Sequence, residues 1–227
     1  MWKIGKKVIG VDGSRIAMLL LVTNRCQNEY IIRCFTNGLE QIFSVIAFYF
    51  YIDQNRSFSV NTVVLTALIS LAFMMRNTSP IGWIPLLAYK VLFSGSLIPF
   101  ILSGIFVALP ILALCTYVDT VYYGGNEWVF TGINFLKVNV VHGLSKYFGE
   151  DPWYWYLAAF APLIYTAIYP IVLYANTLGH MEIQSKKGQP AYLTYYVCFY
   201  VFFFSVIPHK EARFLLPLIP FTLLTTG

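Results

Sequence analysis

The chain has 227 residues, of which 58% are hydrophobic and only 11% are charged, and its formal net charge is +5. Soluble domains ordinarily carry about 25% charged residues, and a soluble fold of this length could not bury so much apolar surface. The composition therefore excludes an ordinary soluble domain. No basic run supports a nucleic-acid-binding protein.

Residues 1–33 have no structure that the sequence pattern predicts. The apolar run at 16–23 is too short to cross a bilayer, which takes about 20 apolar residues, and the segment at 24–33 is too polar for lipid. A basic start followed by an apolar run has the shape of a signal peptide, but no small-residue cleavage site follows it. We therefore treat residues 1–33 as an unassigned N-terminal segment.

From residue 34 onward, apolar stretches alternate with short polar segments. This pattern predicts an all-α membrane protein, a bundle of about six to seven transmembrane helices. The last stretch begins at Phe214 and runs to the final residue. Because a helix cut inside lipid leaves its last carbonyls unpaired, we expect the chain to be a fragment of a longer protein. The predicted spans are 35–52, 59–75, 80–92, 96–117, 153–176, 191–207 and 214–227.

The distribution of lysine and arginine predicts which loops share a side of the membrane. Lys186 and Lys187 form the clearest basic loop, and such loops favour the cytosolic side. Alternation of the spans then places residues 76–80, the loop 118–152 and the segment 209–213 together on the opposite side. Cations on that side are candidates for binding an anion.

The loop 118–152 has a helical period in its middle. Apolar residues recur at spacings of three or four, and polar residues fill most of the other positions, which predicts an amphipathic helix lying in the luminal membrane interface. Such helices often serve only as anchors, so that alternative stays open. The apolar positions are Ile133, Leu136, Val140, Leu144 and Phe148.

Four ionisable residues fall within five positions between two apolar stretches: His209, Lys210, Glu211 and Arg213. Prolines at 208, 217 and 220 predict an irregular backbone here, which is tolerated at membrane depth only where it is buried in protein or lines a cavity. Arg213 can bind two phosphate oxygens at once, and Lys210 adds a point charge. Glu211 can orient either of these two side chains. The alternative is a pair of cations that extend to water beside the membrane. Neither a metal-ligand spacing nor an acid–base pair is recognisable.

Several segments, in order along the chain, carry a resemblance to one family. "HKEARF" resembles the H-K-E-x-R-F signature of the dolichyl-phosphate-mannose-dependent mannosyltransferases of the endoplasmic reticulum, glycosyltransferase family 22, which have the multi-span GT-C architecture. "RCFTNGLEQIFSVIAFYFY" looks like that family's R-T-x-T-N-x-x-E span, and "MRNTSPIGWIPLL" looks like its R-P-T helix start, with Asn77 in place of the proline. "NFLKVNV" and "YFGEDPWYWY" are most similar to the glycosylphosphatidylinositol (GPI) mannosyltransferase 3 branch.

This resemblance, over residues 33–227, implies a partial GT-C-like transmembrane domain at 34–227, in a multi-pass protein of the endoplasmic reticulum membrane. The implied reaction transfers mannose from dolichyl phosphate mannose to a glycolipid with inversion, without a further cofactor. The implied acceptor is the GPI precursor at its third, α-1,2-linked mannose; the α-1,2-mannosyltransferase of lipid-linked oligosaccharide assembly is the alternative. The family's acidic general base, in its first luminal loop, has no match in residues 1–33.

The resemblance also implies roles for particular residues. The donor phosphate would be bound by His209, Lys210, Glu211 and Arg213, and the catalytic base stays unassigned. A transporter and a catalytically silent membrane subunit are the competing functions, although the internal repeats typical of transporters are not found. The candidates for shaping the substrate pocket are Asp119, Tyr122, Asn134, Lys137, Asn139 and Trp153.

Overall fold

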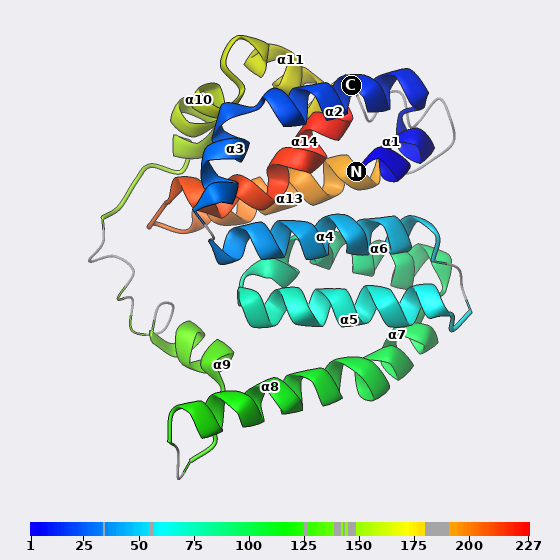
Figure 1. The fold of residues 1–227 in the computed structure, drawn as a ribbon, viewed down its shortest axis with the longest axis vertical. Coiled ribbons are helices and arrows are strands. Elements are labelled where there is room, and N and C mark those ends of the chain that lie inside the picture. The colour runs from blue at the N-terminus through cyan, green and yellow to red at the C-terminus, as the bar shows by residue number, and fades with distance from the viewer. Residues whose placement is uncertain are drawn as a thin grey trace.

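The computed structural model describes residues 1–33, 35–54, 57–124, 127–138, 142, 144, 149–179 and 191–227, and all regular structure within these ranges is helical. Figure 1 shows a layered bundle in which α4 and α5 run side by side, with α13 and α14 packed beyond α4. The longer helices confirm the all-α prediction. Their bounds are α4 Thr36–Ile52, α5 Val60–Met75, α6 Trp83–Ser94, α8 Leu109–Tyr122, α13 Tyr192–Val206 and α14 Ile219–Thr226.

The N-terminal 33 residues, which the sequence pattern left unassigned, form three helices. Asn24 separates the second from the third, and its side-chain oxygen accepts a hydrogen bond from the backbone N–H of Gln27 at 2.8 Å, which satisfies one of the donors exposed at a helix start. The amide of Asn24 also donates to the carbonyl of Ile164, 140 residues away. The three helices are α1 Trp2–Val8, α2 Val11–Thr23 and α3 Arg25–Ile32.

The remaining elements are short and often begin or end at proline or glycine. Gly95 ends α6 in the left-handed region, at φ 64°, where a residue without Cβ is unstrained. The predicted irregular backbone after residue 208 is confirmed, because Pro217 lies inside a 3₁₀ helix. These elements are η1 Ser79–Gly82, α7 Leu97–Ser103, η2 Gly104–Ala108, α9 Thr131–Leu136, η5 Tyr156–Phe160, α10 Ala161–Tyr165, η6 Thr166–Ile168, α11 Tyr169–Tyr174, η7 Ala175–Gly179 and η8 Ala212–Leu218.

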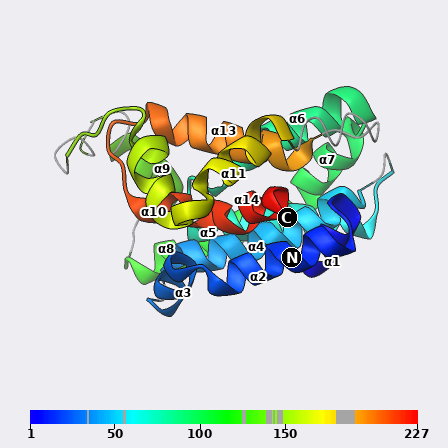
Figure 2. The same ribbon diagram turned by 90° about the horizontal axis from the view of Figure 1, so that it is seen from above.

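Helix α14 forms the centre of the bundle. Seen from above in Figure 2, it lies between α2 and α4 on one side and α13 on the other, and residues 219–225 are all buried. Its Phe221 ring lies 4.7 Å from the ring of Tyr196 on α13 and 5.4 Å from that of Phe48 on α4. The core of the described protein is therefore an aromatic cluster that joins three helices.

Within the described residues, two helical stretches are long and apolar enough to cross a membrane by length and composition. They are Leu97–Tyr122 and Tyr156–Leu178, and the pair of α3 and α4 adds a third if its 116° bend lies within one span. Three shorter apolar helices accompany them in the described part of the chain, Val60–Met75, Tyr192–Val206 and Ala212–Thr226. A multi-span membrane protein is confirmed, while six to seven crossings stay a prediction.

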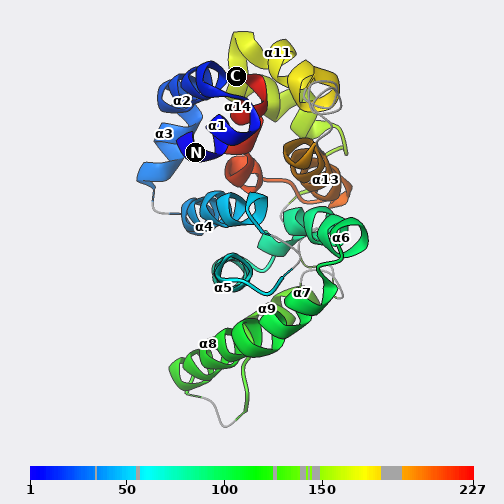
Figure 3. The same ribbon diagram turned by 90° about the vertical axis from the view of Figure 1, so that its right-hand side faces the viewer.

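The region predicted as a luminal loop, residues 118–152, begins differently from the expectation. Helix α8 continues past the expected end at residue 117 to Tyr122, so the loop starts later. The long stretch that ends in α8 projects away from the rest of the bundle in Figure 3. Helix α9 is the described start of the predicted amphipathic helix, and most of the remainder, 139–141, 143 and 145–148, lies outside the described residues.

Candidate functional site

The charged segment 209–213 lies where α13 has just ended. Ile207 is extended, at ψ 129°, as expected for the residue before Pro208. The backbone N–H of Asp151 donates to the carbonyl of Pro208 at 3.1 Å, and a ring nitrogen of His209 lies 3.2 Å from the carbonyl oxygen of Gly149. The structure thus brings 149–151 and 208–210 to the same end of the bundle, as the predicted alternation of spans requires.

Lys210 is a buried cation that holds these two segments together. Its ammonium donates to the carbonyl of Ile207 at 2.7 Å and to the carbonyl of Asp151 at 3.0 Å, and the residue is 5% exposed. Burial lowers the pKa of the Lys210 ammonium, and the charge of Asp151 opposes that effect. An ammonium has three N–H donors, and hydrogen bonds to carbonyls of described residues use two of them.

Glu211 lies between a histidine and an arginine. Its carboxylate accepts both Nε–H and Nη2–H of Arg213, the latter at 3.1 Å, and one of its oxygens lies 3.0 Å from Nε2 of His209. Burial would raise the pKa of the Glu211 carboxyl, but the hydrogen bonds and charges of Arg213 and His209 outweigh it and hold that pKa below its ordinary value. Glu211 is therefore held in its ionised form, bonded twice to the Arg213 guanidinium.

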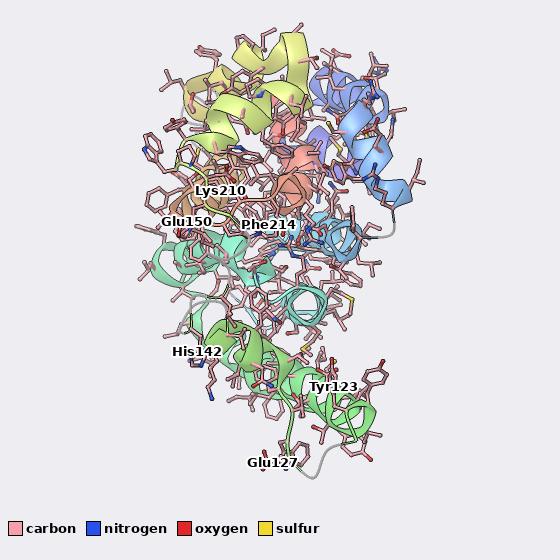
Figure 4. All side chains as sticks on the ribbon, turned by 90° about the vertical axis from the view of Figure 1, so that its left-hand side faces the viewer. Tyr123, Glu127, His142, Glu150, Lys210 and Phe214 are labelled. Atoms are coloured by element: carbon pink, nitrogen blue, oxygen red, sulfur yellow. The ribbon has the colours of Figure 1, made fainter. Side chains whose placement is uncertain are left out.

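An open cleft of about 440 Å³ adjoins this segment. The side chain of Arg213 is 45% exposed, and its guanidinium lies 5.9 Å from the centre of the Phe35 ring. One wall is charged and the other aromatic, so the cleft can take an anionic group together with an apolar or sugar surface. Figure 4 shows Lys210 near Glu150 and Phe214 at this level of the bundle. The lining residues are Tyr30, Phe35, Trp155, Lys210, Glu211, Ala212 and Arg213.

Of the four predicted phosphate-binding residues, three line the cleft and the fourth supports them. His209 is not among the lining residues, but its ring contacts Glu211 and packs edge-on against Phe214 at 6.2 Å. In the described residues no group of three or more His, Cys, Asp or Glu side chains is arranged to hold a metal ion.

The candidate pocket residues lie elsewhere. Asp119, on the last turns of α8, accepts a hydrogen bond from Thr131 at 2.9 Å, and Tyr122 is 82% exposed. Figure 4 places Tyr123 and Glu127, their neighbours, far below Lys210. None of the described candidates lines the cleft, and Asn139 lies outside the described residues. The other candidates are exposed: Asn134, Lys137 and Trp153.

The sequence reasoning missed the aromatic wall. Tyr30 and Phe35 meet at 6.0 Å because the chain bends by 116° between α3 and α4, and no periodic pattern announces such a bend. It also passed over Glu40, a carboxylate in the middle of an apolar stretch, with 1% of its side chain exposed. An ionisable residue inside a predicted span is a signal that could have drawn attention to it.

Comparison with known proteins shows which family the chain belongs to. The whole chain, residues 1–227, matches the Alg9-like mannosyltransferase family. The protein belongs to that family. The match takes in residues 1–33, where the sequence reading found no resemblance, and so extends the family region to all of the N-terminal helices.

The names of individual relatives agree with this family assignment. The chain is 30% identical over 196 residues to a GPI alpha-1,2-mannosyltransferase 3 of Bos taurus, covering 86% of this chain and 34% of that protein. It is 28% identical to the GPI mannosyltransferase 3 of Trypanosoma brucei brucei, with 94% and 38% covered, and 28% identical to that of Candida albicans, with 100% and 44% covered. The chain thus spans less than half of the length of these relatives. No solved structure matches.

Proposed function

We propose that this chain is the part of a GPI mannosyltransferase that binds the dolichyl phosphate mannose donor. The enzyme would transfer mannose, with inversion, to the third position of the GPI precursor in the endoplasmic reticulum membrane. The observation that carries the proposal is the cleft in which the guanidinium of Arg213 faces an aromatic wall. Membership of the mannosyltransferase family and the names of the relatives support the reaction class and the acceptor.

The charges of the cleft fit the demands of this reaction. An acceptor hydroxyl oxygen bonds to C1 of the mannose, the bond from C1 to the phosphate oxygen breaks, and the hydroxyl proton passes to a base. Negative charge grows on the departing dolichyl phosphate, and fixed cations aimed at that charge lower the barrier. Arg213 and Lys210 would supply the cations, and the ionised Glu211 would hold the guanidinium in its plane.

The aromatic wall suits the rest of the donor. Tyr30, Phe35 and Trp155 line the cleft together with the charged segment, and aromatic rings can pack against a sugar face or the first unit of a lipid chain. Asp119, Tyr122, Asn134, Lys137, Asn139 and Trp153 stay candidates for shaping the substrate pocket.

Complementation tests the proposal. The protein, expressed from its complete coding sequence, should restore GPI-anchored surface proteins in cells that lack the third mannose of the anchor. Arg213→Ala should lower transfer about 10²–10³-fold, the usual cost of losing one donor to a developing anion, at normal protein abundance. Arg15→Ala is the matched control, because Arg15 is an exposed arginine paired with Asp12 on α2.

The outcomes separate the parts of the proposal. Full activity of Arg213→Ala would overturn the phosphate-binding role. Restoration of only a lipid-linked-oligosaccharide mutant would retain mannose transfer and change the acceptor. No restoration of either mutant would overturn the proposed reaction.

A further inference from the structure

A second charged cluster lies inside the bundle, next to Phe214. Glu40 on α4 accepts a hydrogen bond at Oε2 from Nη1 of Arg76 at 3.2 Å, and at Oε1 from the hydroxyl of Tyr200 at 3.2 Å. The side chains of Glu40 and Arg76 are 1% and 13% exposed, and Tyr200 is fully buried. The cluster joins the first turns of α4 to the end of α5 and to α13.

Stability alone is a weak reason for such a cluster. Removing two charges from water costs several kcal/mol per ion, and a buried ion pair often contributes no more to folding than packed apolar side chains would. A buried pair that joins three helices does, however, fix their relative positions, because moving any one of them leaves a charge unpaired. The contacts around the cluster indicate which part of the protein this rigidity serves.

The polar face of α4 leads from the cluster to the cleft. Asn37 and Gln41, on the same face of the helix as Glu40, are both buried. The amide of Asn37 donates to the carbonyl of Arg213 at 2.6 Å, and the amide of Gln41 donates to the carbonyl of Leu216 at 2.7 Å. Two side chains next to Glu40 therefore hold the main chain of the segment that carries the cleft's guanidinium.

Arg76 adds a third contact to the same segment. Its guanidinium lies over the ring of Phe214, 5.0 Å from the ring centroid, while one nitrogen bonds Glu40. Phe214 directly follows Arg213. Residues 213, 214 and 216 are thus each held by a different side chain, two from α4 and one that Glu40 itself holds in place.

We infer that Glu40, Arg76 and Tyr200 form a positioning unit that fixes the main chain of residues 213–216 and thereby the place of the Arg213 guanidinium in the cleft. The inference rests on the proposed function of that cleft. These three residues do not line the cleft; they act through Phe214 and through the polar face of α4. Because a misplacement of about 1 Å can cost on the order of a hundredfold in rate, loosening the unit should impair transfer without removing any group that touches the substrate.

Two tyrosine-to-phenylalanine variants provide the test. Tyr200→Phe removes the hydroxyl that bonds Glu40. Tyr51→Phe is the matched control, because Tyr51 is also fully buried and its hydroxyl donates to the carbonyl of Leu86 at 2.9 Å, at the far end of α4. Each variant loses one buried hydrogen bond, and Tyr200→Phe should lose somewhat more thermal stability because its partner is a carboxylate, so the kinetic values rather than the stabilities carry the comparison.

Kinetics should distinguish them. In membranes from cells expressing the complete coding sequence, Tyr200→Phe should lower kcat about tenfold or more and weaken inhibition by dolichyl phosphate by a similar factor. Tyr51→Phe should change each value by less than about twofold, the scatter expected of a distant site. Arg76→Lys keeps the charge but not the planar group over Phe214, so its kcat should lie between those of wild type and Arg76→Ala.

Equal kinetics for Tyr200→Phe and Tyr51→Phe, with an active wild type, would overturn the positioning role and leave the proposed function standing. An inactive wild type would instead overturn the proposed function and the inference with it. If Arg76→Ala fails to accumulate, the comparison of the two tyrosine variants still decides, since each loses only one hydroxyl.

Discussion

Gly82 ends the short helix η1 at the point where that helix meets two tyrosine rings of α13. A Cβ built on Gly82 would lie 2.7 Å from two ring carbons of Tyr196 and 2.9 Å from a ring carbon of Tyr200. Carbon atoms in favourable contact are about 3.5–4.0 Å apart. Gly82→Ala therefore requires the rings, or η1 itself, to move by about 1 Å.

The surroundings oppose that movement. Tyr196 and Tyr200 are both fully buried, and the Tyr196 ring lies 4.7 Å from Phe221 and 5.6 Å from Trp83. Inserting a methyl group into a packed core ordinarily costs about 1–3 kcal/mol. For a chain of this size each kcal/mol lowers the unfolding midpoint by about 2–4 °C. We therefore expect Gly82→Ala to lower the free energy of unfolding by about 1–3 kcal/mol and to lower the unfolding midpoint accordingly.

Gly38→Ala is the control, because it is the same substitution where no atom lies within 4 Å of the new Cβ. In helix α4 alanine is favoured over glycine by up to about 1 kcal/mol, so this variant should be as stable as wild type or more so. Thermal unfolding of the purified proteins in detergent, followed by intrinsic fluorescence, compares the two. A Gly82→Ala protein that melts with or above Gly38→Ala would refute the packing argument.

Two further predictions concern stability. Asn24→Ala should lower the unfolding midpoint by an amount equivalent to about 1–2 kcal/mol, since it removes the cap of α3 and the bond to Ile164. Asn24→Ser, which keeps a capping oxygen and adds no charge, should lose less, and equal losses would show that the cap contributes nothing. Hydrogen bonds from Arg213 and His209 hold the pKa of the Glu211 carboxyl below its ordinary value. The stability that the ionised carboxylate contributes is therefore complete above about pH 4.3 and is lost as the pH falls through the folded pKa. The difference in unfolding midpoint between wild type and Glu211→Gln should accordingly be constant from about pH 7 to 5 and shrink toward zero at lower pH. A difference that grew on acidification would contradict the predicted direction of this pH dependence.

Much of the local structure follows from short-range chemistry. Apolar stretches bounded by proline, glycine and polar residues are enough to predict helices in lipid, because in a membrane every backbone group must be paired within its own segment. The prolines around residue 208 likewise predict the irregular backbone that the structure has. Alternation of the predicted spans placed the loop 118–152 and the segment 209–213 on one side, and the hydrogen bonds that join residues 149–151 to residues 208–210 agree.

The cleft and its support depend on packing between distant residues. Tyr30 and Phe35 become a wall only through the bend between α3 and α4, and Trp155 reaches it from another part of the chain. Glu40 finds Arg76 36 residues later and Tyr200 160 residues later. Periodicity and composition describe each helix separately, so they cannot say which polar faces will meet.

The sequence by itself therefore determined the class of protein, the approximate helices and the charged segment 209–213. Only the tertiary structure decided what that segment faces and what holds it. The physical reason is that the cost of burying a charge such as Glu40 is met by partners brought together by the whole bundle, whereas the cost of exposing backbone to lipid is met within each helix.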